Sequence, residues 1–216
     1  MKFSDFTITV LKNFSNVNQG VVLKPGTFQR TMSADKTFMI EVDFEETFTH
    51  KFGIYDLNQF IGNISAMDDP ELTFTDKMVV IEDSTFKLNY HACDPELIAS
   101  PGDKQLPDDF DVKFNLPKSS LNKILTLASL NALPNISVVG ENGELLMIAH
   151  DKNNSSSIKA SSRISDFDGE DFSATLKMKN LRILPDDYTV SILKDKYAKF
   201  SSCNHKLTYF AGLETK

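Results

Sequence analysis

Tyr55-Asp56-Leu57-Asn58-Gln59-Phe60-Ile61-Gly62 decides the fold of this chain, because it predicts a short amphipathic helix set between strands. Asp56 can cap the helix, and Leu57, Phe60, Ile61 and Ile64 recur at the spacing of one helix face. Three strand-like segments follow, at 71–75, 78–81 and 85–91. This part of the chain therefore indicates a helix that covers a small sheet.

A second stretch has the same order of elements. Met178-Lys179-Asn180-Leu181-Arg182-Ile183-Leu184-Pro185 predicts another short helix, followed by strands at 188–193, 198–202 and 207–213. Each half also has a longer amphipathic helix near its start. The first, at about 5–16, should turn Lys12 and Asn13 away from its apolar face; the second, at 118–130, follows a strand at 112–116 and can be capped by Ser119 or Ser120. Lys24-Pro25-Gly26 predicts a hairpin between strands at 21–23 and 27–30. We therefore expect an α+β fold built from two copies of a sheet-plus-two-helix unit.

The regular pattern lapses between Ala92 and Asp111. Asp94-Pro95, Ser100-Pro101-Gly102 and Leu106-Pro107 interrupt this segment, which is typical of an extended connector. A structureless segment of that length is more natural between two domains than inside one. The predicted division is a first domain at 1–92, a connector at 93–111 and a second domain at 112–216.

The composition is that of a globular protein, with 41% apolar and 25% charged residues among 216. No apolar run is long enough to span a membrane, so we expect no membrane association. The net charge of −7 is uneven, since residues 1–110 carry 9 Lys/Arg and 18 Asp/Glu whereas residues 111–216 carry 14 and 12. An acidic protein of this kind can still have a local basic surface.

No residue cluster predicts catalysis, a metal or a cofactor. The four histidines are scattered, and Cys93 and Cys203 lack the spacing of metal ligands. The acidic segment 166–171 superficially suggests a calcium loop, but the required frame of ligands is missing, so a solvated turn is expected. A repeated unit without such a cluster favours a scaffold over an enzyme.

Several cations lie on or beside the predicted helices. Because the apolar stripes face the sheets, these cations should project from the opposite faces and could hold phosphates without reading bases. From the residues alone, a solvated helix surface and a DNA-facing surface both remain open. The candidates are Lys2, Lys12, Lys118, Lys123, Lys177, Lys179 and Arg182.

The motifs together resemble the sliding clamps of T4-type bacteriophages. The stretch at 55–62 is similar to the Tyr-Asp-Leu-Asn-x-Phe-Leu-Gly motif of that family, and Leu11-Lys12-Asn13-Phe14 resembles its first helix. The segments 20–28, 166–170 and 178–188 also have counterparts there, in the same order. The resemblance therefore spans nearly the whole chain.

This resemblance implies a DNA polymerase processivity factor without catalytic activity or cofactor. Family members are homotrimeric rings that encircle double-stranded DNA, with sheets outside and helices lining the hole. An ATP-dependent clamp loader opens and closes the ring, the DNA polymerase is tethered to it, and late-transcription factors are further partners. The expected location is the cytoplasm of the infected bacterial host.

Two further surfaces are expected. Subunits should join through the edge strands at 85–91 and 157–164, because pairing removes exposed edges. The interface candidates are Thr85, Phe86, Leu88, Tyr90, Ile158, Ser161 and Ile164. A pocket for partner peptides, for which ordinary packing is the alternative, would involve Ile98, Leu106, Pro107, Phe210, Ala211 and Leu213.

Two other protein classes remain open. A β-rich viral structural or assembly protein could use the same edge pairing, and would polymerise where a clamp forms a discrete trimer. A single-strand-binding protein is a weaker option, because it should expose aromatic residues in a basic groove. Assembly state separates the first of these from a clamp.

Overall fold

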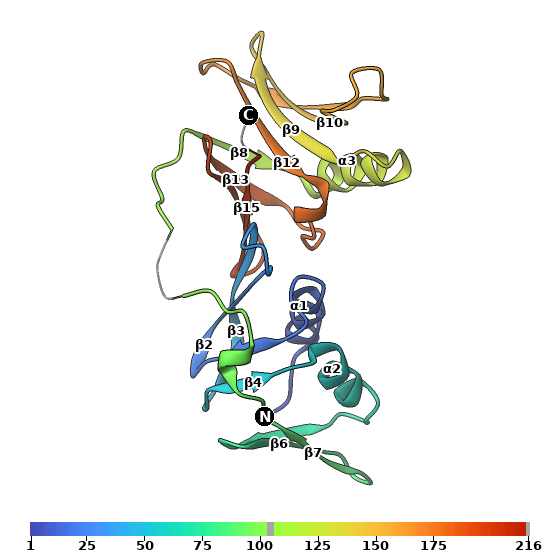
Figure 1. Ribbon diagram of the computed structural model, residues 1–216, viewed down its shortest axis with the longest axis vertical. Helices are drawn as coiled ribbons and strands as arrows, with labels where there is room; N and C mark the ends of the chain where they lie inside the picture. The colour runs from blue at the N-terminus through green and yellow to red at the C-terminus, as the bar shows by residue number, and fades with distance from the viewer. Residues whose placement is uncertain (103–105, 215–216) are drawn as a thin grey trace. The chain divides into compact units, whose positions relative to one another are not determined.

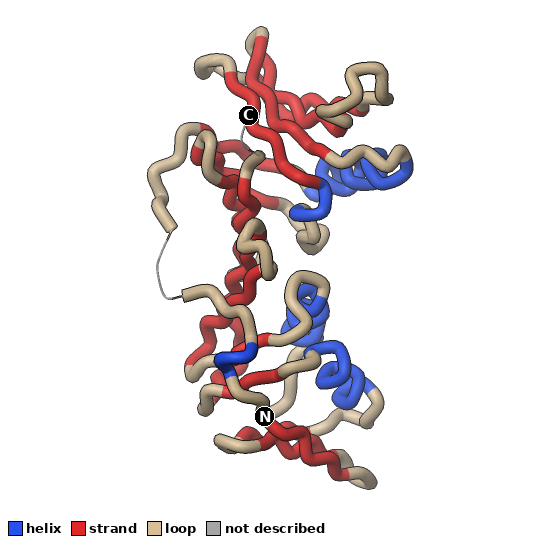
Figure 2. The backbone as a smooth tube through the Cα atoms, in the orientation of Figure 1, coloured by secondary structure: helices blue, strands red, loops and turns tan. Residues whose placement is uncertain are grey.

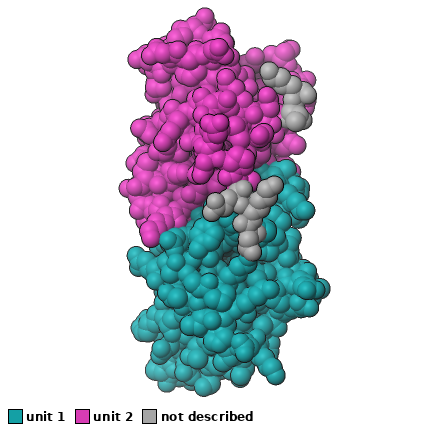
Figure 3. All heavy atoms as spheres, turned by 90° about the vertical axis from the view of Figure 1, so that its left-hand side faces the viewer, with its two compact units in different colours: residues 1–104 teal, residues 105–216 magenta. Residues whose placement is uncertain are grey.

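The computed structural model describes residues 1–102 and 106–214. The chain divides into two compact units, residues 1–104 and 105–216 (Figure 3). The division falls within 93–111, the segment expected to be the connector. None of the helices in the described ranges is long and apolar enough to cross a membrane.

Unit 1 combines two helices with short antiparallel sheets (Figure 1). Strand β1 pairs with β4, β2 pairs with β3, and β5, β6 and β7 form a three-stranded sheet in that order. The elements are α1 (Asp5–Ser15), β1 (Val21–Leu23), β2 (Gly26–Met32), β3 (Phe38–Phe48), β4 (Phe52–Ile54), α2 (Leu57–Ser65), β5 (Glu71–Phe74), β6 (Met78–Glu82), β7 (Lys87–His91) and the 3-10 turn η1 (Pro95–Leu97).

Both helices of unit 1 begin where the sequence predicts. The Ser4 hydroxyl accepts a hydrogen bond from the Thr7 amide at 3.2 Å, and an Asp56 carboxylate oxygen accepts one from the Gln59 amide at 2.9 Å. These caps satisfy amides that have no partner inside the helix. Asn13 was expected to face solvent, and this was wrong, since it is only 5% exposed.

The hairpin expected between β1 and β2 is absent from the described strands, because both strands pair elsewhere. The side chain of Gln29, only 1% exposed, supplies the missing bonds. The Lys24 amide donates to Gln29 Oε1 at 2.8 Å, and Gln29 Nε2 donates to the Lys24 carbonyl at 2.7 Å. A side-chain amide thus replaces a strand partner at this corner, which local turn chemistry did not indicate.

Unit 2 contains two four-stranded antiparallel sheets, ordered β11-β10-β9-β12 and β8-β13-β14-β15. Helix α3 packs on β10 and β11 and buries Leu121, Ile124 and Ala128. The elements are β8 (Val112–Leu116), α3 (Lys118–Leu130), β9 (Asn135–Glu141), β10 (Glu144–His150), β11 (Ala160–Asp166), β12 (Phe172–Lys177), the 3-10 turn η2 (Met178–Asn180), β13 (Tyr188–Leu193), β14 (Tyr197–Ser202) and β15 (Leu207–Gly212).

The pairing pattern of unit 1 recurs in unit 2. Strands β9 and β12 pair as β1 and β4 do, β10 and β11 pair as β2 and β3 do, and β13-β14-β15 repeats β5-β6-β7. The expectation of two copies of one fold is confirmed, with two differences. Among the described strands, β9 also pairs with β10, whereas β1 does not pair with β2. In the order of elements, η2 stands where α2 stands in unit 1 (Figure 2).

The fourth helix expected over 178–185 is therefore wrong, because only one 3-10 turn forms there. Pro185 disfavours helical geometry at the residue before it. Leu181 and Ile183 are also buried, so the chain after the turn packs in an extended path. With a strand ending at Lys177, too little chain remains for a stable α-helical segment.

Helix α3 has the expected bounds but a different cap. Neither Ser119 nor Ser120 caps it, and Pro117 occupies the cap position without a side-chain bond. Asp187 replaces the cap, since its carboxylate accepts a hydrogen bond from the Lys118 amide at 2.7 Å. A distant acidic side chain is favourable at this helix end because of the helix dipole.

The acidic segment 166–171 forms a turn that is held by a pair of packed aromatic rings, Phe167 and Phe172. The rings of Phe167 and Phe172 lie 5.3 Å apart and pack over Gly140, where an added Cβ would lie 2.5 Å from Phe167 Cε1. We expect Gly140→Ala to lower the free energy of unfolding by about 1–3 kcal/mol through overpacking. Urea denaturation measures this, with Gly62→Ala as control because an added Cβ there meets nothing within 4 Å. Equal stability of Gly140→Ala and wild type would contradict the close packing of the two rings over Gly140.

Candidate nucleic-acid interface

The helix surfaces differ in charge from the rest of this acidic chain. Within the described residues, α1, α2 and α3 together contain one of the chain's 30 acidic residues, Asp5. They carry Lys12 on α1 and Lys118 and Lys123 on α3, all with exposed side chains. A surface without carboxylates and with a few lysines attracts phosphates over short distances.

Lys123 lies on the side of α3 that faces away from its sheet. The buried stripe passes through Leu121, Ile124 and Ala128, and Lys123 is about 100° from Ile124 around the helix. Ser119, Asn122 and Thr126 are exposed beside it. This face offers cations and neutral polar groups, and Leu130, 77% exposed, lies at its C-terminal end.

Lys177 does not share this face. In β9, Asn135 and Ser137 alternate with the fully buried Ile136, and Lys177 of β12 lies directly opposite Asn135. Lys177 Nζ is 3.5 Å from a carboxylate oxygen of Glu214, whose other oxygen accepts a hydrogen bond from Asn135 at 2.7 Å. Because α3 covers the buried face, Lys177 lies on the opposite side of the sheet from Lys123.

The other candidate cations are dispersed. Lys2 precedes α1 and forms an ion pair with Asp69. Lys179 is in η2 and Arg182 follows it, both exposed. The structure thus brings together Lys118 and Lys123 on one helix, and it contradicts a single patch of seven cations.

Two edge strands lie where the interface was expected. Among the described strands, β7 ends the sheet β5-β6-β7 and β11 ends the sheet β11-β10-β9-β12. The expected strand ranges differ slightly: Thr85 and the 69%-exposed Phe86 lie in the turn before β7, and the 62%-exposed Ile158 precedes β11. Within the strands, Leu88, Tyr90 and Ile164 are half-buried and Ser161 is exposed.

Tyr90 is turned toward its own unit. Its ring lies 5.0 Å from that of Phe60 on α2, and its hydroxyl donates to the Asp56 carbonyl at 3.2 Å. Its side chain therefore anchors β7 to α2. Any contribution of this residue to subunit pairing would come from its backbone.

Asp83 orders the turn that leads into β7. Amide hydrogen bonds from Phe86, Thr85 and Asp68 lower the pKa of Asp83 from 3.8 to about 2. The stabilisation is therefore fully present above pH 3.8 and is lost as the pH falls toward 2. We expect wild type to be more stable than Asp83→Asn at neutral pH, with the difference shrinking over that range.

Urea midpoints measured at a series of pH values test this expectation. Asp168→Asn, at an exposed position in the 166–171 turn, is the control for loss of one negative charge. A difference between wild type and Asp83→Asn that stays constant down to pH 3 would contradict the role of the carboxylate.

The expected peptide pocket is only partly assembled. The hydroxyl of Tyr197 donates to the Pro107 carbonyl, and its ring lies 5.8 Å from that of Phe210, so these two candidates are close together. Ala211 is a wrong candidate, because it is fully buried on the other face of β15. Of the remaining three, Ile98 is buried in unit 1, Leu106 is 38% exposed, and Leu213 forms a bridge with Leu176.

Sequence reasoning missed three charged residues of unit 2. Glu214 holds Lys152 as well as Lys177, with Lys152 Nζ 2.9 Å away. Lys113 and Lys199 lie on the outward face of β8 and β14, where strand alternation could have placed them. No local signal predicts the Glu214 contacts, because the partners lie far apart in the chain.

Comparison with known proteins agrees with the fold. A family model described as DNA polymerase processivity factor matches residues 2–100. The chain is 29% identical over 221 residues to the sliding clamp of Vibrio phage KVP40, covering 99% of each. It is 28% identical over 226 residues to the sliding clamp of Enterobacteria phage T4, covering 99% of this chain and 97% of that one.

Solved structures show the same fold at low identity. PCNA from A. fulgidus, solved with the C-terminal region of FEN-1, has a TM-score of 0.73 at 13% identity and covers 97% of this chain and 95% of its own. The H. pylori beta clamp bound to a DNA ligase peptide has a TM-score of 0.72 at 13% identity, over 100% of this chain and 65% of its own. The chain therefore has the fold of the solved clamps and is similar over its full length to the sliding clamps of phages such as KVP40 and T4.

Proposed function

We propose that three copies of this chain close into a ring around duplex DNA and tether the replicative DNA polymerase to its template. The observation that carries this proposal is the charge of the helices: they hold Lys12, Lys118 and Lys123 and a single acidic residue, in a chain of net charge −7. The subunits join by pairing β7 of one copy with β11 of the next.

This arrangement performs tethering without catalysis. A ring that slides needs attraction without registry, and flexible lysines can exchange one phosphate for the next as the ring moves. Because the helix surfaces offer no rigid set of donors to base edges, no sequence holds the ring in place. A closed ring therefore stays on DNA without tight binding, since it can leave DNA only at an end.

The same proposal names the partners. A closed ring must be opened to admit DNA, so an ATP-dependent clamp loader acts on it in the cytoplasm of the infected bacterium. The DNA polymerase and late-transcription factors bind the assembled ring. Resemblance to the T4-type clamps supports these partners, and the edge positions of β7 and β11 support the pairing of subunits.

Retention on circular DNA tests the function. The labelled protein, its loader, ATP and a nicked plasmid are incubated and passed through a sizing column. We expect the protein to elute with circular DNA and to be released when the plasmid is cut once. Primer extension with the matching polymerase should give longer products only when this protein is present. Equal retention on cut and uncut DNA would contradict encirclement.

The alternative of a viral structural protein makes a different prediction. Edge pairing without closure gives open filaments, whereas a closed ring has a fixed subunit number. Sedimentation equilibrium distinguishes these, with a single species of three subunits expected. A mass that keeps rising with concentration would favour the structural protein.

A further inference from the structure

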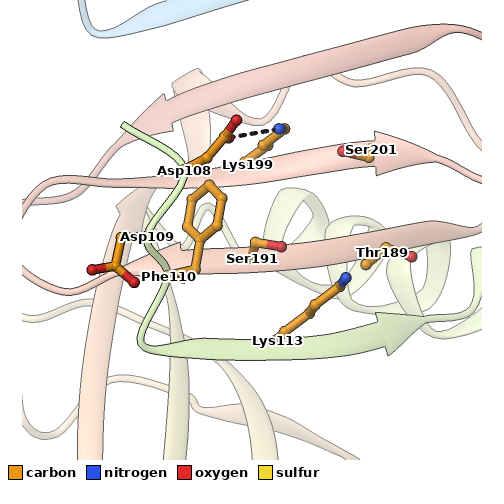
Figure 4. Close-up of a pocket in the computed structure, with 8 residues that line it drawn as sticks. All are labelled: Asp108, Asp109, Phe110, Lys113, Thr189, Ser191, Lys199 and Ser201. Atoms are coloured by element: carbon orange, nitrogen blue, oxygen red, sulfur yellow. Dashed lines mark hydrogen bonds and ion pairs between the residues drawn. The ribbon is translucent and has the colours of Figure 1, made fainter. Parts of the chain in front are cut away.

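A polar hollow of about 630 Å³ lies on the outward face of one sheet in unit 2 (Figure 4). Its floor comes from strands β8, β13 and β14, and one wall comes from the chain just before β8. The lining residues are Asp108, Asp109, Phe110, Lys113, Thr189, Ser191, Lys199 and Ser201.

Strand register arranges the floor in rows. Ser191 is opposite Lys113 on one side and opposite Lys199 on the other, so it lies between the two lysines in the sheet, and the Lys113 ammonium points toward Thr189 (Figure 4). The Cα atoms of Lys113 and Lys199 are separated by two strand spacings, about 10 Å. Strands β8, β13, β14 and β15 contain no Asp or Glu, so this floor is cationic in an acidic chain.

Lys199 is held in position by its neighbours. Its Nζ lies 5.6 Å from the centroid of Phe110 and 5.8 Å from that of Phe210, which are cation–π distances. It also lies 3.0 Å from a carboxylate oxygen of Asp108. The side chain of Lys199 is 26% exposed, so little freedom remains to be lost when it binds an anion.

The ion pair between Asp108 and Lys199 is weak. Its side chain is 76% exposed, and an ion pair open to water contributes little stability and exchanges readily. Lys113 is exposed and has no ion-pair partner among residues 1–102 and 106–214. One cation is therefore covered by a replaceable carboxylate, and the other is available.

We propose that this hollow binds an extended acidic segment of a partner protein. One carboxylate of the segment takes the place of Asp108 on Lys199, a second reaches Lys113, and the Ser191 hydroxyl donates between them. Acidic residues two apart in an extended chain are separated by about 7 Å, and the flexible side chains span the rest. Asp108 itself shows that Lys199 accepts a carboxylate, which favours an acidic peptide over a nucleic acid. This proposal rests on the proposed tethering function in one respect, because it assumes that the chain binds a partner protein.

Fluorescence anisotropy with a defined probe tests the site. The probe is a fluorescein-labelled peptide of alternating Glu and Ser, and alternating Gln and Ser serves as its neutral counterpart. Full-length Asp108→Asn should bind the acidic probe several-fold more tightly than wild type, because the internal competitor loses its charge. The double variant Lys113→Gln/Lys199→Gln should bind about tenfold more weakly. Lys159→Gln, an exposed lysine outside the hollow, should leave binding unchanged.

Three results would overturn the proposal: equal binding of the neutral peptide, equal weakening by Lys159→Gln and the double variant, or no tightening by Asp108→Asn. Stronger binding of a single-stranded oligonucleotide at the same lysines would reassign the hollow to nucleic acid. Thermal unfolding of each variant checks that its fold is retained. Because the probe assay uses no DNA or polymerase, its failure leaves retention on circular DNA unaffected, and the two proposals fail separately.

Discussion

Replacing Lys12, Lys118 and Lys123 together by Glu is expected to shorten primer-extension products by roughly tenfold or more, because each phosphate contact is lost and a repulsive charge replaces it. The substitution reverses every lysine of α1, α2 and α3, so the surface that we propose to face DNA changes from cationic to anionic. The salt dependence of loading should also weaken, with a slope lower by about one for each phosphate contact removed. Product length at a series of salt concentrations measures both effects.

A matched variant separates this local effect from net charge. Lys36, Lys51 and Lys196 are exposed and lie outside the helices and outside the edge strands β7 and β11, so reversing them changes the total charge equally. This control should extend primers nearly as wild type does. Lys177→Gln should do so too, because that residue lies on the opposite sheet face from Lys123. Equal losses in the control and helix variants would show that only bulk charge matters.

Replacing Asn89 by Pro is expected to convert the proposed trimer to monomers. The Asp83 amide bonds the Phe86 carbonyl at 3.0 Å and the Ala92 amide bonds the Lys77 carbonyl at 2.9 Å, which sets the alternation along β6 and β7. By that alternation, the Asn89 amide points away from β6 toward the free edge. Proline removes this donor and adds a ring at the subunit contact.

The expected loss is about 2 kcal/mol at each contact, or roughly thirtyfold in the dissociation constant. Sedimentation velocity at micromolar concentration measures it. Asn89→Ala removes the side chain but keeps the amide, so it should remain trimeric. The thermal midpoint of monomeric Asn89→Pro should show that the bonds between β6 and β7 persist. An unchanged trimer in Asn89→Pro would exclude β7 as the pairing edge.

Local sequence signals predicted most of the elements but less of their pairing. The bounds of α3 and β8 match the prediction, because helix periodicity and strand alternation are properties of neighbouring residues. Lys24-Pro25-Gly26 looked like a hairpin, yet β1 pairs with β4 across a long stretch of chain. Strands that are distant in sequence decide the partner of β1, and the hydrogen bonds of Gln29 to the Lys24 backbone are visible only in the folded structure.

The candidate site shows the same limit. Lys118 and Lys123 were predicted to be exposed on a helix, and both are exposed on α3, about 140° apart around its axis. Lys177 was expected to adjoin a helix and to project with the helix cations, whereas it ends β12, so its direction follows a period of two rather than 3.6. The positions of β7 and β11 at sheet edges were predicted correctly. Their pairing between subunits stays a prediction.

The dependence of one corner on Gln29 has a consequence for chemical ageing. Hydrolysis of its side-chain amide would leave a carboxylate where Nε2 now donates to the Lys24 carbonyl. That lesion would bury a negative charge beside a carbonyl oxygen, which is costly without a donor. Since Gln29 is 1% exposed, the native packing shields the amide, and damage would begin in molecules that open transiently. Mass analysis of long-stored protein at this one residue would therefore record how often the corner opens.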